Sequence, residues 1–386
     1  MASKGHARRA GHDGEVKKPM ETVTVATLRE WLAEHKPVTV LDVRAQEDRD
    51  QWSIPGSVHV DAYEALKQGR SDVLIGVVIP ARGPVITVCN RGKVSQIAAE
   101  QLRRRGVEAI SLAGGMQAWS LAWNIAEVPL ANTGAQVLQV RRTGKGCLSY
   151  VLGSSGSAAV VDASLEPTVY IHLAEARGWR INYVFETHVH ADHLSRSRLL
   201  AVETGAALFM PAQQRVRFDF NPLTDGRVIE FGSSSISVLR TPGHTSESTC
   251  YLLDDSCVMT GDTLFLAAVG RPDLHANENE ARERARMLFR SLCRLRSLPS
   301  HLPVLPSHTS APVPFDGIPL AASLEQVFSR LDGWFASEDE FVARLLSRLP
   351  PTPPNYQQIV DLNERGVSPA VDVTELEAGA NRCAIS

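Results

Sequence analysis

Histidine and aspartate residues gather at four places in this 386-residue chain where buried strands are predicted to end. Residues 187–193 read Thr-His-Val-His-Ala-Asp-His and directly follow the apolar run 181–185. His244, Asp262 and His308 stand in three further turns, each close to a glycine or a proline. Loops at strand ends can bring dispersed imidazole and carboxylate groups to a common metal ion. The spacing therefore predicts a metalloenzyme.

The candidate ligands number enough for either one metal ion or two. They are His188, His190, Asp192, His193, His244, Asp262 and His308. Imidazoles one residue apart can aim at a common ion, as His188 and His190 would, whereas Asp192 and His193 would face a neighbouring position. Asp262 could bind one ion or bridge two, and the last histidine of the set would complete a second site.

Cys89 begins a loop whose composition favours a reactive sulfur. The loop follows an apolar strand-like run and precedes a predicted helix, and the residues that would cradle the sulfur are Asn90, Arg91, Gly92, Lys93, Val94 and Ser95. Backbone N–H groups in such a loop converge on the sulfur, and a helix N-terminus favours an anion there. With two basic side chains nearby, this setting predicts a thiolate or a persulfide at Cys89.

Two kinds of architecture must position these groups. Residues 20–128 alternate between helix and strand, with a helix at 24–35 and strands at 38–41, 85–88 and 109–112, which predicts a parallel α/β sheet. Residues 135–346 begin with strands separated by Gly/Ser turns and continue through the histidine-rich loop to an amphipathic helix at 279–298. The predicted division is a disordered tail at 1–19, the two domains at 20–128 and 135–346, and a C-terminal extension at 347–386.

The second domain resembles the metallo-β-lactamase superfamily over about residues 136–345. The HxHxDH motif, the Thr-Pro-Gly-His-Thr turn at 241–245, the Gly-Asp-Thr-Leu-Phe segment at 261–265 and the late histidine match in that order. The resemblance implies an αββα sandwich with metal ions at one edge. It leaves the reaction open, because the superfamily contains glyoxalase II-type thioester hydrolases, lactamases, nucleases and persulfide dioxygenases.

The first domain resembles the rhodanese sulfurtransferases over about residues 20–125. The matching pieces are Val40–Arg44, Ile54–Gly56, the cysteine loop, Gly114, Gly115 and Trp119. The resemblance implies an α/β rhodanese fold in which Cys89 is catalytic and carries a sulfane sulfur as a persulfide. It also implies that Asp42 and Arg44 form a structural pair.

A sulfur carrier fused to this metal domain is most similar to the persulfide dioxygenases. Gly270–Asp273, Thr241–Ser248 and Pro354–Tyr356 carry that likeness. It implies an oxidoreductase of hydrogen sulfide metabolism that uses O₂ to oxidise the persulfide of glutathione or a related thiol to sulfite. Thiosulfate is a possible substrate of the sulfurtransferase domain.

The dioxygenase hypothesis places one Fe(II) on His188, His244 and Asp262, with His190 as a further candidate ligand. Asp192, His193 and His308 would then orient the ligands or bind a second metal ion. Arg271 could bind an acidic end of the substrate, or it could form a salt bridge with Asp273.

Two alternatives stay open. The first is a binuclear Zn²⁺ thioester hydrolase of the glyoxalase II type with a sulfur-carrier domain. All seven ligands agree with it, but no Lys-rich helical domain follows His308. The second is a sulfur-relay protein whose metal domain binds its ligand without turnover.

Composition limits the partners and the location. A formal charge of −3 predicts no binding to nucleic acid, and no apolar run is long enough to cross a membrane. The six cysteines show no disulfide-framework spacing and the N-terminus has no apolar signal segment, so a cytoplasmic protein is expected. Cys147, Cys250 and Cys257 are predicted to pack as small hydrophobes. A homodimer is compatible with the sequence.

Overall fold

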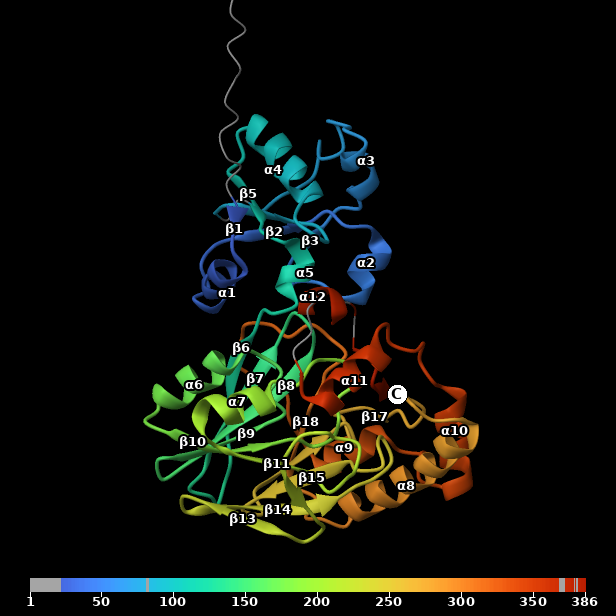
Figure 1. The fold of residues 1–386 in the computed structure, drawn as a ribbon. Coiled ribbons are helices and arrows are strands. Elements are labelled where there is room, and N and C mark those ends of the chain that lie inside the picture. Colours follow the sequence, from blue (N-terminus) through green and yellow to red (C-terminus); the bar gives the residue numbers. More distant parts are fainter. Residues whose placement is uncertain (1–21, 81–82, 368–371, 378, 380) are drawn as a thin grey trace, which may run out of the picture.

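The computed structural model describes residues 22–80, 83–367, 372–377, 379 and 381–386, so the predicted tail at 1–19 lies outside the described residues. The chain forms a smaller N-terminal domain that stands on one end of a larger second domain (Figure 1). In the described ranges, no helix is both long and apolar enough to cross a bilayer.

The N-terminal domain is built on a parallel sheet of five strands in the order β1-β5-β4-β2-β3. The strands are β1 (Thr22–Val23), β2 (Thr39–Asp42), β3 (Val58–His59), β4 (Val85–Val88) and β5 (Ala109–Leu112). The helices are α1 (Val25–Ala33), α2 (Gln46–Gln51), α3 (Tyr63–Lys67), α4 (Val94–Arg104) and α5 (Gly115–Trp119). All residues of β2 and β4 are buried, as expected for central strands of a parallel sheet covered on both faces.

The second domain contains two mixed sheets packed face to face. The seven-stranded sheet has the order β12-β11-β10-β9-β8-β7-β6 and the six-stranded sheet has the order β13-β14-β15-β16-β18-β19. The strands of the first sheet are β6 (Asn124–Val128), β7 (Gln136–Arg142), β8 (Cys147–Ser154), β9 (Ser157–Val161), β10 (Arg180–Phe185), β11 (Ala207–Pro211) and β12 (Asn221–Leu223). Those of the second are β13 (Val228–Phe231), β14 (Ser234–Arg240), β15 (Thr249–Leu253), β16 (Cys257–Gly261), β18 (Pro303–Pro306) and β19 (Ala322–Ser323).

Helices cover the outer face of each sheet and complete an αββα sandwich. Helices α6 (Pro167–Glu175) and α7 (Ser197–Thr204) share a buried apolar cluster with the first sheet. Helices α8 (Glu278–Arg296), α9 (Leu324–Arg330) and α10 (Glu338–Ser347) share another with the second sheet. A third cluster, which includes Phe185 and Tyr251, fills the space between the sheets. The fold class expected from the sequence is therefore confirmed.

One domain boundary differs from the expectation. Strand β6, which the sequence placed at the end of the first domain, pairs antiparallel with β7 from Asn124↔Arg141 to Val128↔Val137. The Pro- and Gly-containing stretch after β6 resembles a linker, but it connects two neighbouring strands of one sheet. The first domain consequently ends before Asn124.

The predicted C-terminal extension packs against both domains. Helix α11 (Tyr356–Arg365) contacts the histidine-rich loop, and β20 (Ala384–Ile385) pairs with β17 (Val269–Gly270). Between them, α12 (Val373–Leu376) lies where the two domains meet (Figure 1). There Thr374 accepts a hydrogen bond from Gln117 of the first domain at 3.0 Å.

Candidate metal centre

The predicted ligands come together at one edge of the sandwich, from loops that follow four strands. The histidine-rich loop follows β10, His244 follows β14, Asp262 follows β16 and His308 follows β18. Strands from both sheets thus contribute to one buried group of imidazoles and carboxylates.

His188, His244 and Asp262 form the first group. The Oδ2 atom of Asp262 lies 3.8 Å from Nε2 of His188 and 3.6 Å from Nε2 of His244. Among the described residues, the His188 Nε2 and Asp262 Oδ2 atoms are buried without a hydrogen-bond partner. Because an unpaired buried polar atom is costly, these orphaned donors and acceptors fit a divalent cation. A metal position at this group therefore agrees with the residues present.

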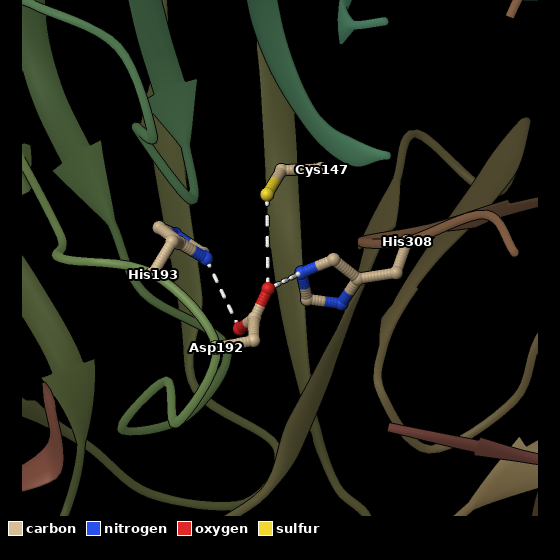
Figure 2. A group of neighbouring side chains, drawn as sticks. All are labelled: Cys147, Asp192, His193 and His308. Carbon is tan, nitrogen blue, oxygen red and sulfur yellow. Dashed lines mark hydrogen bonds and ion pairs between the residues drawn. The ribbon is translucent and has the colours of Figure 1, made fainter. Parts of the chain in front are cut away.

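Asp192, His193 and His308 form a second group, which a fourth side chain, Cys147, joins (Figure 2). Asp192 contacts both imidazoles, with Oδ1 at 3.1 Å from His193 Nδ1 and Oδ2 at 2.7 Å from His308 Nε2. The other ring nitrogen of His308 lies 2.6 Å from Oδ1 of Asp262. Asp262 therefore faces the first group with Oδ2 and contacts His308 of the second group with Oδ1.

His190 does not join either group. Its Nε2 lies 2.9 Å from Glu186 Oε2 and 3.3 Å from Asp162 Oδ1, in a third buried cluster behind the first two. Burial alone would lower the pKa of His190, but the carboxylates of Asp162 and Glu186 raise it well above its ordinary value. In this arrangement His190 pairs with two carboxylates, and the first group consists of His188, His244 and Asp262.

Hydrogen bonds hold the ligand rings in place. Nδ1 of His188 lies 2.9 Å from the Thr187 hydroxyl, which donates to Asp162 at 2.8 Å. Nδ1 of His244 lies 2.8 Å from the backbone carbonyl of Arg271, an acceptor that requires the proton on that nitrogen. Fixing one ring nitrogen in this way directs the other toward a metal ion. Sequence reasoning missed the contributions of Thr187 and Asp162.

Arg271 has a structural role in this arrangement. Its buried guanidinium forms a two-pronged pair with Asp273 at 2.8 and 2.7 Å, and it also donates to the carbonyls of Pro351 and Arg382. The backbone N–H of Arg271 donates to Cys383. This is the salt-bridge alternative that the sequence left open, so the structure gives no support to a substrate contact by Arg271.

The surroundings of Cys147 differ from those expected of a packing residue. Burial alone would raise the pKa of its thiol, but His193 and His308 bring it down to about 6. Burial raises the pKa of Cys250 and of Cys257 to about 12, as expected of thiols that pack in a core. Cys147 is buried as the packing prediction requires, but its sulfur also lies 3.7 Å from Asp192 Oδ2, so it has polar as well as apolar contacts.

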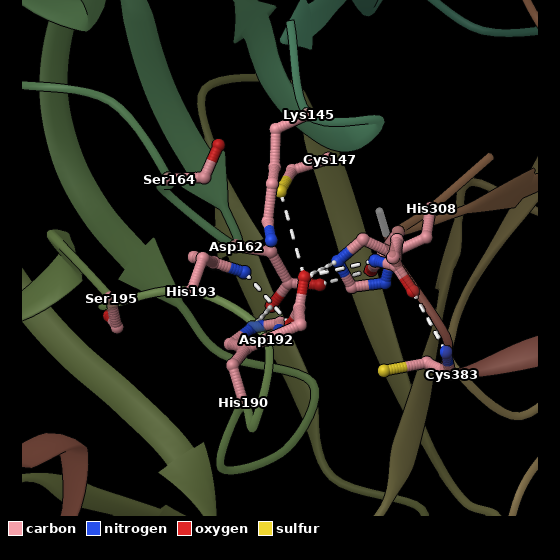
Figure 3. A network of polar contacts seen from close by, with 12 residues as sticks. Lys145, Cys147, Asp162, Ser164, His190, Asp192, His193, Ser195, His308 and Cys383 are labelled. Carbon is pink, nitrogen blue, oxygen red and sulfur yellow. Dashed lines mark hydrogen bonds and ion pairs between the residues drawn. The ribbon is translucent and has the colours of Figure 1, made fainter. Parts of the chain in front are cut away.

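Two cavities reach the ligands. One of about 250 Å³ is bounded by His308, Asn381 and apolar side chains such as Phe265. The other, of about 370 Å³, is bounded by His188, His190 and residues of the histidine-rich loop. Asn381, in the last segment of the chain, donates to Asp192 at 3.0 Å. The C-terminal segment thus forms part of the wall of the site (Figure 3).

The cysteine loop of the first domain lies at the carboxyl end of β4 and the start of α4. The buried Cys89 sulfur accepts a hydrogen bond from the Ser95 N–H at 3.3 Å, and the Ser95 hydroxyl lies at the same distance. Arg91 pairs with Glu375 of α12 at 3.1 Å. Asp42 and Arg44 form a buried pair at 2.7 Å, as expected. The loop therefore faces the C-terminal segment of the second domain.

We expect Gly115→Ala to disrupt the cysteine loop. Gly115 has a φ of +59°, and an added Cβ would lie 2.1 Å from the carbonyl oxygen of Cys89. The alanine cannot fit without moving the backbone that carries the sulfur, at a cost of about 1–3 kcal/mol. The free energy of unfolding in urea should fall by this amount, and the rate of Cys89 alkylation should differ from that of the wild type. Gly106→Ala is the matched control, because Gly106 has a φ of +82° and no atom of the described residues lies within 4 Å of an added Cβ. It should strain its own turn and leave Cys89 alkylation unchanged.

Family profiles match two separate parts of the chain. The rhodanese-like domain matches residues 24–122 and the metallo-beta-lactamase superfamily matches residues 142–301. With the parallel sheet and the αββα sandwich, they show that the chain is a rhodanese-like domain followed by a metallo-beta-lactamase fold.

Two solved structures share the fold of the second domain. A metallo-beta-lactamase from Staphylococcus aureus is 24% identical, with a TM-score of 0.54 over 61% of this chain and 74% of its own. ETHE1 from Myxococcus xanthus is 26% identical, with a TM-score of 0.52 over 61% of this chain and 98% of its own. The likeness to ETHE1 supports the recognition of a metallo-beta-lactamase-fold domain fused to a rhodanese-like domain.

The curated relatives that match in sequence are named as hydrolases. The hydroxyacylglutathione hydrolase of Methylococcus capsulatus is 36% identical over 157 residues, which cover 40% of this chain and 58% of that protein. The hydroxyacylglutathione hydrolase of Rhizobium johnstonii is 33% identical over 120 residues, which cover 30% and 46%. The chain thus spans about half the length of the curated relatives it matches.

These relatives overturn the prediction of an iron-dependent persulfide dioxygenase and favour the thioester hydrolase that the sequence left as an alternative. The physical reason lies in the motif that carried the prediction. In Gly270–Asp273, Arg271 and Asp273 bind each other, and the Arg271 carbonyl orients His244. That stretch holds the metal ligands in place, so its presence does not favour one reaction over another. The ligands fit a divalent metal without choosing iron or zinc.

Proposed function

We propose that the second domain is a binuclear, zinc-dependent hydrolase of thioesters formed by glutathione or a similar thiol. The observation that carries this proposal is Asp262, which reaches His188 and His244 through one oxygen and His308 through the other. A carboxylate placed in this way would bind one ion and, through His308 Nδ1, hold the ring of a ligand to a neighbouring ion. The names of the curated relatives support the thioester as substrate.

The residues of the two ligand groups have separate roles in such a site. His188, His244 and Asp262 would hold one ion, and Asp192, His193 and His308 the other, while Asp262 would also orient the His308 ring through its Nδ1 atom. Zinc bound there would polarise the thioester carbonyl and supply a hydroxide-like nucleophile at neutral pH. Thr187 and the Arg271 carbonyl keep the rings of His188 and His244 oriented. The wall that includes Phe265 and Asn381 would exclude bulk water from one side.

We also propose that the rhodanese-like domain carries sulfur on Cys89. Hydrolysis of a thioester adds water across the C–S bond and yields a carboxylic acid and a thiol. That thiol is a suitable acceptor for the outer sulfur of a Cys89 persulfide. The thiol attacks, the S–S bond of the persulfide breaks, Cys89 leaves as a thiolate, and the acceptor becomes a persulfide. The two domains would then share one thiol.

The test is metal analysis and turnover of the full chain. We expect about two zinc ions per chain and hydrolysis of a hydroxyacyl thioester of glutathione, followed by release of free thiol. Cys89→Ser should leave this hydrolysis unchanged and abolish persulfide formation from thiosulfate. One iron per chain, with oxygen uptake on glutathione persulfide and no thioester hydrolysis, would contradict the proposal.

A further inference from the structure

We propose that Cys147 is a ligand of the second metal position, which makes that position a two-histidine, one-aspartate, one-cysteine site. The inference rests on the proposed binuclear centre and extends it. It distinguishes the two positions chemically, because the first group contains only nitrogen and oxygen atoms.

The backbone places Cys147 beside the loop that carries His308. The two residues form an antiparallel β-bridge, and the N–H of Leu148 donates to the Ser307 carbonyl at 2.7 Å. On the other side of the bridge, the N–H of Thr309 donates to the Gly146 carbonyl at 2.9 Å. Side chains of bridged residues project from the same face of a sheet. The sulfur and the imidazole therefore point into the same space (Figure 2).

The distances suit one shared cation. Ligand atoms of Cys147, Asp192, His193 and His308 all lie within 4.8 Å of one another, and the Cys147 sulfur is 3.7 Å from Asp192 Oδ2. A sulfur and an oxygen bound to one tetrahedral zinc ion would be about 3.5 Å apart. Asp192 Oδ2 and His308 Nε2 are closer, at 2.7 Å. These two atoms would move apart to about 3.3 Å if both bound one tetrahedral ion.

Buried polar atoms at this position lack other partners. Among the described residues, the buried Nε2 atom of His193 has no hydrogen-bond partner, and that of His308 faces the Asp192 carboxylate. Cys147 itself is 1% exposed and its neighbours are these charged groups rather than a purely apolar core. Cys257, by contrast, belongs to the apolar cluster between the sheets. A thiol among imidazoles and a carboxylate is a metal-ligand setting.

A thiolate changes which ions the position prefers. Soft sulfur ligands favour Zn²⁺ and similar thiophilic ions, whereas Mg²⁺ and Ca²⁺ prefer oxygen. The second position should therefore retain zinc more strongly than a nitrogen-and-oxygen set of the same shape would. Sequence spacing could not show this, because Cys147 lies 45 residues before Asp192 and outside every motif.

The experiment adds Co²⁺ to the metal-free full chain and records the near-ultraviolet charge-transfer band of a cobalt–thiolate bond. We expect the band in the wild type and its loss in Cys147→Ser, with affinity for the second ion falling by more than about tenfold. Cys250→Ser is the matched control, because its buried sulfur lies 3.1 Å from the Thr241 hydroxyl and belongs to none of the three ligand groups of the described residues. It should keep the band.

A second measurement does not depend on a variant that folds. X-ray absorption of the zinc-loaded wild type should show a sulfur scatterer at about 2.3 Å. Two bound ions without any sulfur scatterer or thiolate band would overturn the inference, and so would a band that survives in Cys147→Ser. Thioester hydrolysis is measured separately. Hydrolysis without sulfur ligation refutes this inference alone, and sulfur ligation without hydrolysis refutes the proposed reaction alone.

Discussion

Asp262→Ala should remove both metal ions and nearly all thioester hydrolysis. Each oxygen of Asp262 serves a different ligand group, with Oδ2 near His188 and His244 and Oδ1 at 2.6 Å from His308. Loss of a group that only orients a ligand costs about 10- to 100-fold in metal affinity or activity, and Asp262 would also bind the first ion itself, so its loss should exceed that range. Metal content after dialysis and kcat/KM for the thioester measure the effect.

Asp219→Ala provides the control for this experiment. Asp219 is an exposed aspartate of the same domain, outside the three buried ligand groups. The control should keep both ions and full hydrolysis. If Asp262→Ala also retained two ions per chain, the two groups could not share this carboxylate.

Glu377→Gln should destabilise the protein by about 3–5 kcal/mol, the cost of leaving a buried charge without its partner. Glu377 and Arg142 are fully buried and their side chains meet at 2.6 Å. Glu377 also accepts a hydrogen bond from the N–H of Leu194, directly after the histidine-rich loop. Urea unfolding of the metal-free chain gives the change in free energy. Asp361→Asn breaks an exposed pair with Arg365 and should cost less than about 1 kcal/mol.

The same pair predicts a pH dependence. Burial would raise the pKa of Glu377, but Arg142 outweighs burial and the pKa lies below the ordinary glutamate value. The stabilisation is therefore fully present above the unfolded-state pKa of glutamate and is lost as pH falls through the lower folded-state pKa. The difference in stability between wild type and Glu377→Gln should narrow in acid. A difference that grew as pH fell would contradict this assignment.

Local patterns in the sequence predict most of the regular elements near the site. The helix expected at 279–298 is α8 at Glu278–Arg296, where Asn277 and Glu280 form a capping box. The strand expected at 181–185 is β10 at Arg180–Phe185. Both signals are local, because apolar periodicity and caps act within a few turns of chain.

Contacts between distant segments account for what the sequence did not predict. Cys147 joins His308 through a bridge across the sheet, and Asn381 reaches Asp192 from the other end of the chain. Neither residue belongs to a periodic or motif pattern. The sequence also assigned β6 to the first domain, because nothing in Asn124–Val128 specifies that its partner strand is β7. Strand pairing of this kind depends on the whole fold.

The turn that leads into Cys147 makes the two domains one functional unit. Thr143 accepts a hydrogen bond from the Trp52 indole of the first domain at 2.9 Å, and the N–H of Gly144 donates to Ala122 at 3.2 Å. A Cβ on Gly144 would lie 1.8 Å from the Trp119 carbonyl, so only glycine allows this approach. Cutting the chain between its domains would release the turn that positions a metal-binding thiol. A dissected second domain should therefore load metal differently from the whole protein, so metal binding should be measured on the full chain.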